Sequence, residues 1–234
     1  MRAVTFDAQG TLIEVAEPVG ETYARIAARH GLTRRAADIE RDFRRAFDAA
    51  PPLAFPGASP GRLVDHERAW WYVIVRQAFR PVADGPRFDA CFADLFAHYA
   101  QRDAWRVFPD VVGTLDTLRR SGTRLAVVSN FDARLPIVLD GLGLATFFER
   151  VVYSSHAGAA KPAPAIFTST VAALDVPAGD AIHVGDRVHE DVAGARAAGM
   201  RAVLLDRDDR LPDVPPDVSR IRTLTELVTF RGGI

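Results

Sequence analysis

The second half of the chain alternates short apolar runs with longer segments whose apolar residues recur about every 3.6 positions. Short runs rich in β-branched residues are typical of strands buried on both faces, and the longer segments are typical of helices that cover a sheet. We expect strands at residues 3–6, 125–128, 151–153, 181–184 and 202–205, and helices at 110–120, 133–142, 164–174 and 190–198. The pattern predicts an α/β fold, with a Rossmann-like three-layer α/β/α core around a parallel sheet.

The segment between the first and second expected strands is too long for a single crossover connection. It contains four stretches with helical apolar spacing and no convincing strand among them, at 21–30, 37–49, 65–79 and 87–101. A loop rich in proline and glycine, residues 51–61, interrupts these helices. We therefore predict an inserted helical domain, similar to a four-helix bundle, at residues 17–104. The core is then formed by residues 1–16 and 105–234.

Charge and composition narrow the classes of function. The 234 residues carry 29 Lys plus Arg against 30 Asp plus Glu, and this balance lacks the basic excess typical of proteins that bind nucleic acid or anionic membranes. The N-terminal residues place Asp7 where a signal peptide needs an apolar run, and no stretch reaches the ~18 apolar residues of a membrane span. We expect a soluble cytoplasmic protein, a monomer or homodimer, with no nucleic-acid or membrane partner.

Almost all of the positively charged side chains are arginines. Lys161 is the only lysine and Asn130 is the only asparagine of the chain. A genome rich in G and C explains the general bias, because lysine and asparagine codons are rich in A and T. We therefore consider Lys161 and Asn130 as candidate residues of a functional site.

Polar residues follow the expected strands where ligands bind in sheets of this kind, beyond the carboxyl ends of the strands. Asp7 follows the first strand, Ser129 and Asn130 follow the second, a loop after the third leads to Lys161, and Asp186 follows the fourth. A single aspartate after a strand is usually a turn or cap residue. Four compatible groups after four successive strands predict a shared site.

These motifs, FDAQGTL, VVSN, the lysine and GDRVHED, resemble in order and spacing the four motifs of the haloacid dehalogenase-like hydrolase superfamily. The resemblance covers the whole chain, including a helical cap inserted between the first and second motifs. It implies that Asp7 is the nucleophile, in a catalytic set with Gln9, Thr11 and Lys161, and a carboxylate can form such a covalent intermediate. It also implies that Ser129, Asn130 and Lys161 bind the phosphate group of the substrate.

The resemblance further implies a Mg²⁺ cofactor, which prefers hard oxygen ligands and takes few protein carboxylates. The protein ligands would be Asp7, the backbone carbonyl of Gln9 and Asp186. Asp191 would act through a water molecule or by orienting Lys161. Its alternative interpretation is an acidic residue at a helix N-terminus, where the helix dipole favours a carboxylate in any case.

Gln9 departs from the phosphatase pattern, which has a second aspartate at this position to protonate the leaving group and to activate water. An amide cannot do this, and the loss of general acid–base catalysis typically costs about 10² to 10⁴ in rate. We expect a Mg²⁺-dependent phosphatase for a small phosphate ester, weak or restricted to good leaving groups. One alternative is a metal-independent 2-haloacid dehalogenase acting on a halogenated substrate; a second is a catalytically weak protein that binds a phosphorylated ligand or regulates another.

Three further features of the sequence bear on the site. A dehalogenase would need a cap arginine to receive the halide, and Arg41, Arg44 and Arg45 are available. Trp70 and Trp71 fall on one expected cap helix, where adjacent residues point about 100° apart, so we expect cap core with one ring turned towards the substrate pocket. His183, inside an expected strand, is interpreted as a buried histidine with satisfied hydrogen bonds.

Overall fold

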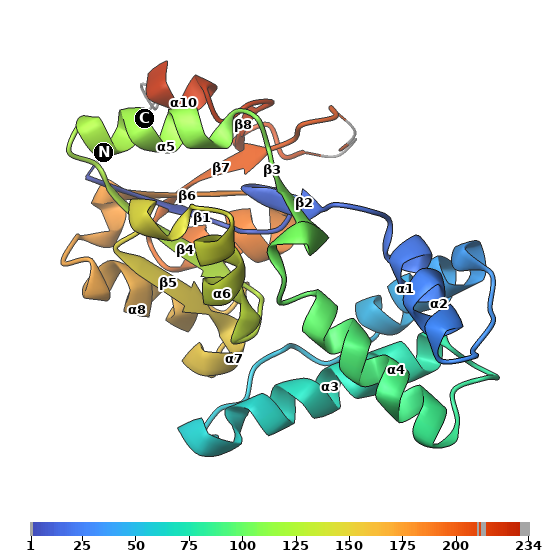
Figure 1. Ribbon diagram of the computed structural model, residues 1–234. Helices are drawn as coiled ribbons and strands as arrows, with labels where there is room; N and C mark the ends of the chain where they lie inside the picture. The colour runs from blue at the N-terminus through green and yellow to red at the C-terminus, as the bar shows by residue number, and fades with distance from the viewer. Residues whose placement is uncertain (1, 210, 212–213, 230–234) are drawn as a thin grey trace.

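The computed structural model describes residues 2–209, 211 and 214–229 (Figure 1). Its centre is a parallel six-stranded sheet in the order β5-β4-β1-β6-β7-β8. The strands are β1 (Ala3–Phe6), β4 (Arg124–Ser129), β5 (Arg150–Tyr153), β6 (Ala181–Gly185), β7 (Arg201–Leu205) and β8 (Ser219–Ile221). The order places β1 between β4 and β6, so the carboxyl ends of these three strands lie side by side.

Helices cover both faces of the sheet because successive side chains of each strand point to opposite faces. On one face, Val4 and Val127 pack in one hydrophobic cluster with Leu115 of α5 and Leu139 of α6. On the other, Ala126 and Val128 pack with residues of α8 and α9. The helices are α5 (Val111–Arg120), α6 (Arg134–Gly141), α7 (Ser154–Ala157), α8 (Pro164–Ala173), α9 (Gly194–Ala197) and α10 (Glu226–Thr229). The predicted α/β fold with a parallel sheet is confirmed.

Four helices lie between the first and second strands of the sheet in sequence, and Figure 1 shows them gathered beside the core. They are α1 (Val19–Arg29), α2 (Ala36–Asp48), α3 (Leu63–Ala78) and α4 (Gly85–His98). They enclose a hydrophobic cluster of their own, in which Tyr23, Ile39, Phe79 and Phe88 are buried. Following the division proposed from the sequence, residues 17–104 are called the cap below.

Two short strands were missed by the sequence analysis where the chain enters and leaves the cap. β2 (Ile13–Val15) and β3 (Trp105–Val107) pair antiparallel, with Ile13 opposite Val107. Each is three residues long, too short to show a reliable apolar period. The pair joins the cap to the core by two adjacent segments of chain.

The expectation of one regular helix at 190–198 was wrong. A π-helix, Val188–Ala193, precedes the short α9, and the amide of Val192 donates to the carbonyl of Arg187, five residues earlier. The wider turn accompanies a hydrogen bond from the Arg187 amide to the carboxylate of Asp191, 2.9 Å long. Such π-turns occur often at functional sites.

Residues 230–234, assigned to the core from the sequence, lie outside the described residues. Among the helices that the structure describes, none combines the length and the apolar character that a membrane crossing requires.

Candidate active site

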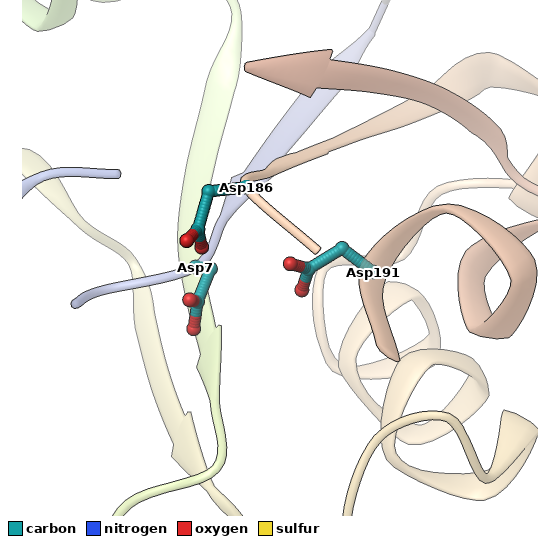
Figure 2. Close-up of side chains that lie close together, drawn as sticks. All are labelled: Asp7, Asp186 and Asp191. Carbon is teal, nitrogen blue, oxygen red and sulfur yellow. The ribbon is translucent and has the colours of Figure 1, made fainter. Parts of the chain in front are cut away.

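Asp7 lies directly after β1, at the centre of the sheet's carboxyl edge. Its backbone amide donates to the carbonyl of Val184 on β6, 2.9 Å away, which fixes the residue against the neighbouring strand. Only 7% of the residue is exposed. Figure 2 shows its carboxylate next to those of Asp186 and Asp191, which come from the segment following β6.

The Lys161 ammonium lies between two of these carboxylates. Its Nζ is 2.7 Å from Oδ1 of Asp7 and 2.6 Å from Oδ1 of Asp191, and 5% of the residue is exposed. Burial alone would lower the pKa of Lys161, but Asp191 and Asp7 outweigh it and raise the pKa above its usual value. The lysine therefore stays protonated and supplies a fixed positive charge beside Asp7.

Asn130, the chain's only asparagine, holds the backbone of its only lysine. Its Nδ2 donates to the Lys161 carbonyl at 3.0 Å, and its Oδ1 accepts from the Lys161 amide at 2.8 Å. The loop after β4 is thereby tied to the loop that carries the ammonium. Ser129 ends β4 and is 3% exposed. A role for Ser129 and Asn130 in binding phosphate stays a prediction.

Of the three aspartates, Asp191 makes the most hydrogen bonds among the described residues. Besides the Lys161 ammonium and the Arg187 amide, it contacts Nε2 of His183 at 3.0 Å, and Nδ1 of that ring lies 2.8 Å from the hydroxyl of Thr5. Burial would raise the pKa of Asp191, but Lys161 and His183 outweigh it and hold the pKa below its usual value. The carboxylate is therefore ionised and oriented towards the lysine.

His183 is fully buried, as the sequence analysis expected, but its contact with Asp191 was missed. Burial lowers the pKa of His183, with partial compensation from Asp191. A neutral ring fits both contacts if Nε2–H donates to Asp191 and Nδ1 accepts from the Thr5 hydroxyl. A signal was available, since Thr5 and His183 are polar residues inside otherwise apolar strands and lie opposite each other in the β1–β6 register.

The three aspartates fit a divalent cation. Asp7, Asp186 and Asp191 each offer a carboxylate oxygen within 4.8 Å of the others. Burial, with the charges of Asp7 and Asp191, raises the pKa of Asp186 to about 7, and its Oδ1 is buried with no hydrogen-bond partner in the part of the chain described here. Mg²⁺ prefers such oxygen ligands, and its charge would offset the repulsion among them. The Gln9 carbonyl as a further ligand stays a prediction.

Two glycines make room for these carboxylates. Gly10 has φ of +85°, and a Cβ built there would lie 2.5 Å from Oδ2 of Asp186. At Gly185 a Cβ would lie 2.2 Å from Cγ of Asp191. Both distances are far below van der Waals contact, so neither position tolerates a larger residue without movement of an aspartate.

The other two residues of the expected catalytic set are placed differently. The Gln9 side chain is exposed, two residues after Asp7. Thr11 is buried, and its hydroxyl has no hydrogen-bond partner among the described residues. Its carbonyl accepts from Nη2 of Arg207 at 2.8 Å, and Nη1 of that arginine pairs with Asp110. Arg207 could not be recognised from the sequence, because it lies beyond the four motifs and belongs to no motif of its own.

The three arginines considered as halide acceptors are exposed on α2. Arg41 pairs with Asp38 on the same helix at 2.7 Å, and Arg44 pairs with Glu40 at 2.8 Å. The charges of Arg41 and Arg44 are thus engaged by carboxylates of their own helix. No contact recorded among the described residues joins them to Asp7.

Comparison with known proteins assigns the family. The chain matches the family model described as haloacid dehalogenase-like hydrolase over residues 1–199. A zebrafish (Danio rerio) protein named haloacid dehalogenase-like hydrolase domain-containing protein 3 is 36% identical over 222 residues, covering 93% of this chain and 91% of that protein. The fold, with Asp7 after β1, Lys161 beside it and the acidic pair after β6, agrees with this class. The chain belongs to the haloacid dehalogenase-like hydrolase family.

Solved structures of two activities share the fold over nearly the whole chain. A phosphatase of this family from Thermococcus onnurineus is 26% identical, with a TM-score of 0.68 over 98% of this chain and 97% of that one. A 2-haloacid dehalogenase from Pseudomonas syringae pv. Tomato is 25% identical, with a TM-score of 0.68 over 97% and 96%. Overall structural similarity therefore does not distinguish a phosphatase from a dehalogenase. The distinction has to come from the residues of the site.

Proposed function

We propose that the protein is a Mg²⁺-dependent phosphatase that hydrolyses a small phosphate ester through an aspartyl-phosphate at Asp7. The observation that carries this proposal is the cluster of Asp7, Asp186 and Asp191 with the Lys161 ammonium beside it. Oδ1 of Asp186, which has no hydrogen-bond partner among the described residues, suits a metal ligand. The phosphatase among the structural relatives is consistent with this activity.

Each residue has a definite task in such a reaction. A carboxylate oxygen of Asp7 attacks phosphorus, and the bond from phosphorus to the leaving oxygen breaks. Lys161 offsets the repulsion between the anionic nucleophile and the anionic substrate, and Ser129 and the amides around Asn130 would donate to phosphate oxygens. Mg²⁺ held by Asp7 and Asp186 would supply further charge stabilisation. Asp191 acts by holding Lys161.

The weak point of this reaction is proton transfer. Gln9 stands where phosphatases of the family carry the acid–base aspartate, and an amide neither protonates a leaving alkoxide nor deprotonates the water that attacks the aspartyl-phosphate. A leaving group that is stable as an anion needs no proton. We infer that activity is greatest towards such esters, for example aryl phosphates.

The test is hydrolysis of an aryl phosphate by the purified protein with Mg²⁺, with a chelator, and by the Asp7→Asn variant with Mg²⁺. We expect the chelator to abolish turnover and the variant to lose activity by a factor on the order of 10⁴. Turnover that does not need metal, or that survives Asp7→Asn, contradicts the proposal.

A 2-haloacid dehalogenase is the second candidate, because release of halide needs no proton and Gln9 would then be no handicap. The structural likeness to the Pseudomonas syringae dehalogenase is consistent with it. Against it are the acidic pair Asp186 and Asp191 and the engagement of Arg41 and Arg44 by their own helix. Halide release from a 2-haloacid in the presence of chelator would favour this candidate over the phosphatase.

A further inference from the structure

The residues that follow the predicted phosphate-binding pair pack under the cap. Asp132 has no exposed surface, and both of its carboxylate oxygens are used. Oδ2 accepts from the indole Nε1 of Trp71 at 2.6 Å and from Nη2 of Arg134 at 2.6 Å, while Oδ1 accepts from Nε of Arg134 at 2.9 Å. Trp71 belongs to α3 of the cap, so this hydrogen bond crosses from the cap to the core.

Arg134 extends the same contact to a second cap helix. Its Nη1 donates to the carbonyl of Phe96 on α4 at 3.1 Å. Its guanidinium lies 4.1 Å from the centre of the Phe96 ring and 5.2 Å from that of Trp71. The pair of Asp132 and Arg134 is thus covered by cap aromatic rings, which is a favourable setting for a guanidinium.

A second residue of α3 reaches the same segment. Glu67 lies one turn before Trp71 on the helix, so both side chains share a face. It accepts from the amide of Ala133 at 3.1 Å and from the hydroxyl of Ser155, at the start of α7, at 2.6 Å. It is 1% exposed. Figure 1 shows α3 running past α7, where these contacts form.

Apart from the hydrogen bond between Glu67 and Ser155, these contacts converge on residues 131–134, called the docking segment below. It begins one residue after Asn130, whose side chain holds the backbone of Lys161. A displacement of the docking segment therefore acts on Ser129 and Asn130 and, through Asn130, on the loop that carries the ammonium beside Asp7. The cap is thus connected to the site indirectly, through its hydrogen bonds to the docking segment and those of Asn130 to Lys161. Among the described residues, no recorded contact joins the cap to Asp7.

We propose that Asp132 and Arg134 are positioning residues, which couple the docking of the cap through Trp71 to the geometry of the loop holding Ser129, Asn130 and Lys161. The proposal rests on the proposed phosphatase function for its kinetic consequence. Its structural consequence is independent of any activity: when the Trp71 contact is lost, the docking segment and the loop before it loosen together.

Trp70 supplies a matched control. It neighbours Trp71 on α3, and its indole also donates a hydrogen bond, but to the carbonyl of Pro51 inside the cap at 2.9 Å. Trp71→Phe removes the indole N–H that reaches Asp132 and keeps an aromatic ring near Arg134. Trp70→Phe removes a donor whose acceptor lies inside the cap, and it keeps an aromatic ring beside Trp71, whose ring centre lies 4.8 Å from that of Trp70. A difference between the two variants therefore reports chiefly on the hydrogen bond to Asp132.

The first measurement is amide hydrogen exchange of the free protein, resolved to peptides, which needs no substrate. We expect Trp71→Phe to speed exchange in α3 and in residues 129–134, and Trp70→Phe to leave residues 129–134 as in the parent protein. Equal exchange at 129–134 in both variants overturns the proposal, and so does faster exchange confined to α3. This arm stands even if the protein proves not to be a phosphatase.

The second measurement is steady-state hydrolysis of an aryl phosphate with Mg²⁺. Loss of a hydrogen bond to a charged group predicts a decrease in kcat/KM of roughly tenfold for Trp71→Phe and less than about twofold for Trp70→Phe. Asp132→Asn should lower kcat/KM further than Trp71→Phe, because it weakens the ion pair with Arg134 as well as the contact with Trp71. A Trp71→Phe enzyme with unchanged kcat/KM overturns the coupling.

Discussion

The cluster around Lys161 and the contact around Asp132 both contain buried charged side chains, but the groups that contact those charges come from different parts of the molecule. Lys161 is held by carboxylates from the carboxyl edge of one sheet, and its loop is held by Asn130. Asp132 and Arg134 are completed by an indole N–H and aromatic rings of the cap. The first cluster is formed by residues of the core alone. The second joins an ion pair of the core, Asp132 with Arg134, to residues of the cap, so it is complete only while the cap is docked.

Substitutions in the two clusters are therefore expected to act in different ways. A change in the core cluster removes charge from the reaction and leaves the cap in place. A change at the docking segment leaves the charges in place and alters how firmly they are held.

Lys161→Arg tests whether the core cluster needs a compact ammonium. A guanidinium is planar and larger, so it cannot approach both Asp7 and Asp191 as the ammonium does. We expect hydrolysis of an aryl phosphate to fall by about 10³-fold, with a circular-dichroism spectrum like that of the parent protein. Arg150→Lys, at an exposed position on β5, is the control. Retained activity in Lys161→Arg would show that any cation serves.

Gln9→Asp tests whether proton transfer is the deficit of the core site. The Gln9 side chain is exposed, two residues after Asp7, so a carboxyl is accommodated there without repacking. We expect turnover of an alkyl phosphate, whose leaving group needs a proton, to rise by about 10²-fold, and turnover of an aryl phosphate to rise less. Gln101→Asp, at an exposed position of the cap, controls for added charge. An equal gain for both esters would contradict the assignment.

Gly185→Ala tests the tight packing of the core cluster. A Cβ there would lie 2.2 Å from Cγ of Asp191, so Asp191 must move. We expect the free energy of unfolding, measured by urea denaturation, to fall by about 1–3 kcal/mol. Gly113→Ala on α5, where a Cβ meets nothing within 4 Å, should instead raise it by up to about 1 kcal/mol. A Gly185→Ala protein as stable as its parent would refute the close approach.

Glu67→Gln tests the cap contact through its dependence on pH. Burial raises the pKa of Glu67 in the folded protein, with partial compensation from the hydrogen bond of Ser155. A carboxyl whose pKa is raised by folding stabilises the fold while protonated, and this stability is lost as the pH rises through the folded pKa. Glutamine keeps an acceptor and does not titrate.

The measured quantity is the free energy of unfolding of Glu67→Gln minus that of the parent protein. We expect this difference to increase in favour of the variant between about pH 4 and pH 7. Glu21→Gln, at an exposed position on α1, should show a nearly constant difference. If Glu67→Gln also gives a constant difference, Glu67 is not buried in solution and the cap is not docked as described.

The sequence predicted the sheet and the candidate site better than it predicted the cap contact. The apolar runs at 3–6 and 181–184 could be recognised because both faces of those strands are covered. A polar residue directly after such a run, such as Asp7 or Asp186, can be placed from topology alone. Strands such as β2 and β8 escaped notice because they are three residues long, and two residues of β8 are exposed.

The cap contact lay beyond sequence reasoning for a physical reason. Helical periodicity shows which face of α3 is apolar, but it does not say which loop of another segment will meet Trp71 or Glu67. The partners Asp132 and Ser155 lie 61 and 88 residues away in sequence. The π-helix at Val188–Ala193 was missed for a similar reason, because its extra width accompanies hydrogen bonds to Asp191 and not a local propensity.

The pairing of the only lysine with the only asparagine makes the site unusually easy to observe. Incorporating ¹⁵N-labelled lysine alone would give a single backbone and a single side-chain resonance, both from Lys161. Labelling asparagine alone would report on its partner in the facing loop. Two isotope labels thus provide a spectroscopic view of the loops around Asp7, in which binding of metal, phosphate or substrate is followed without any introduced probe.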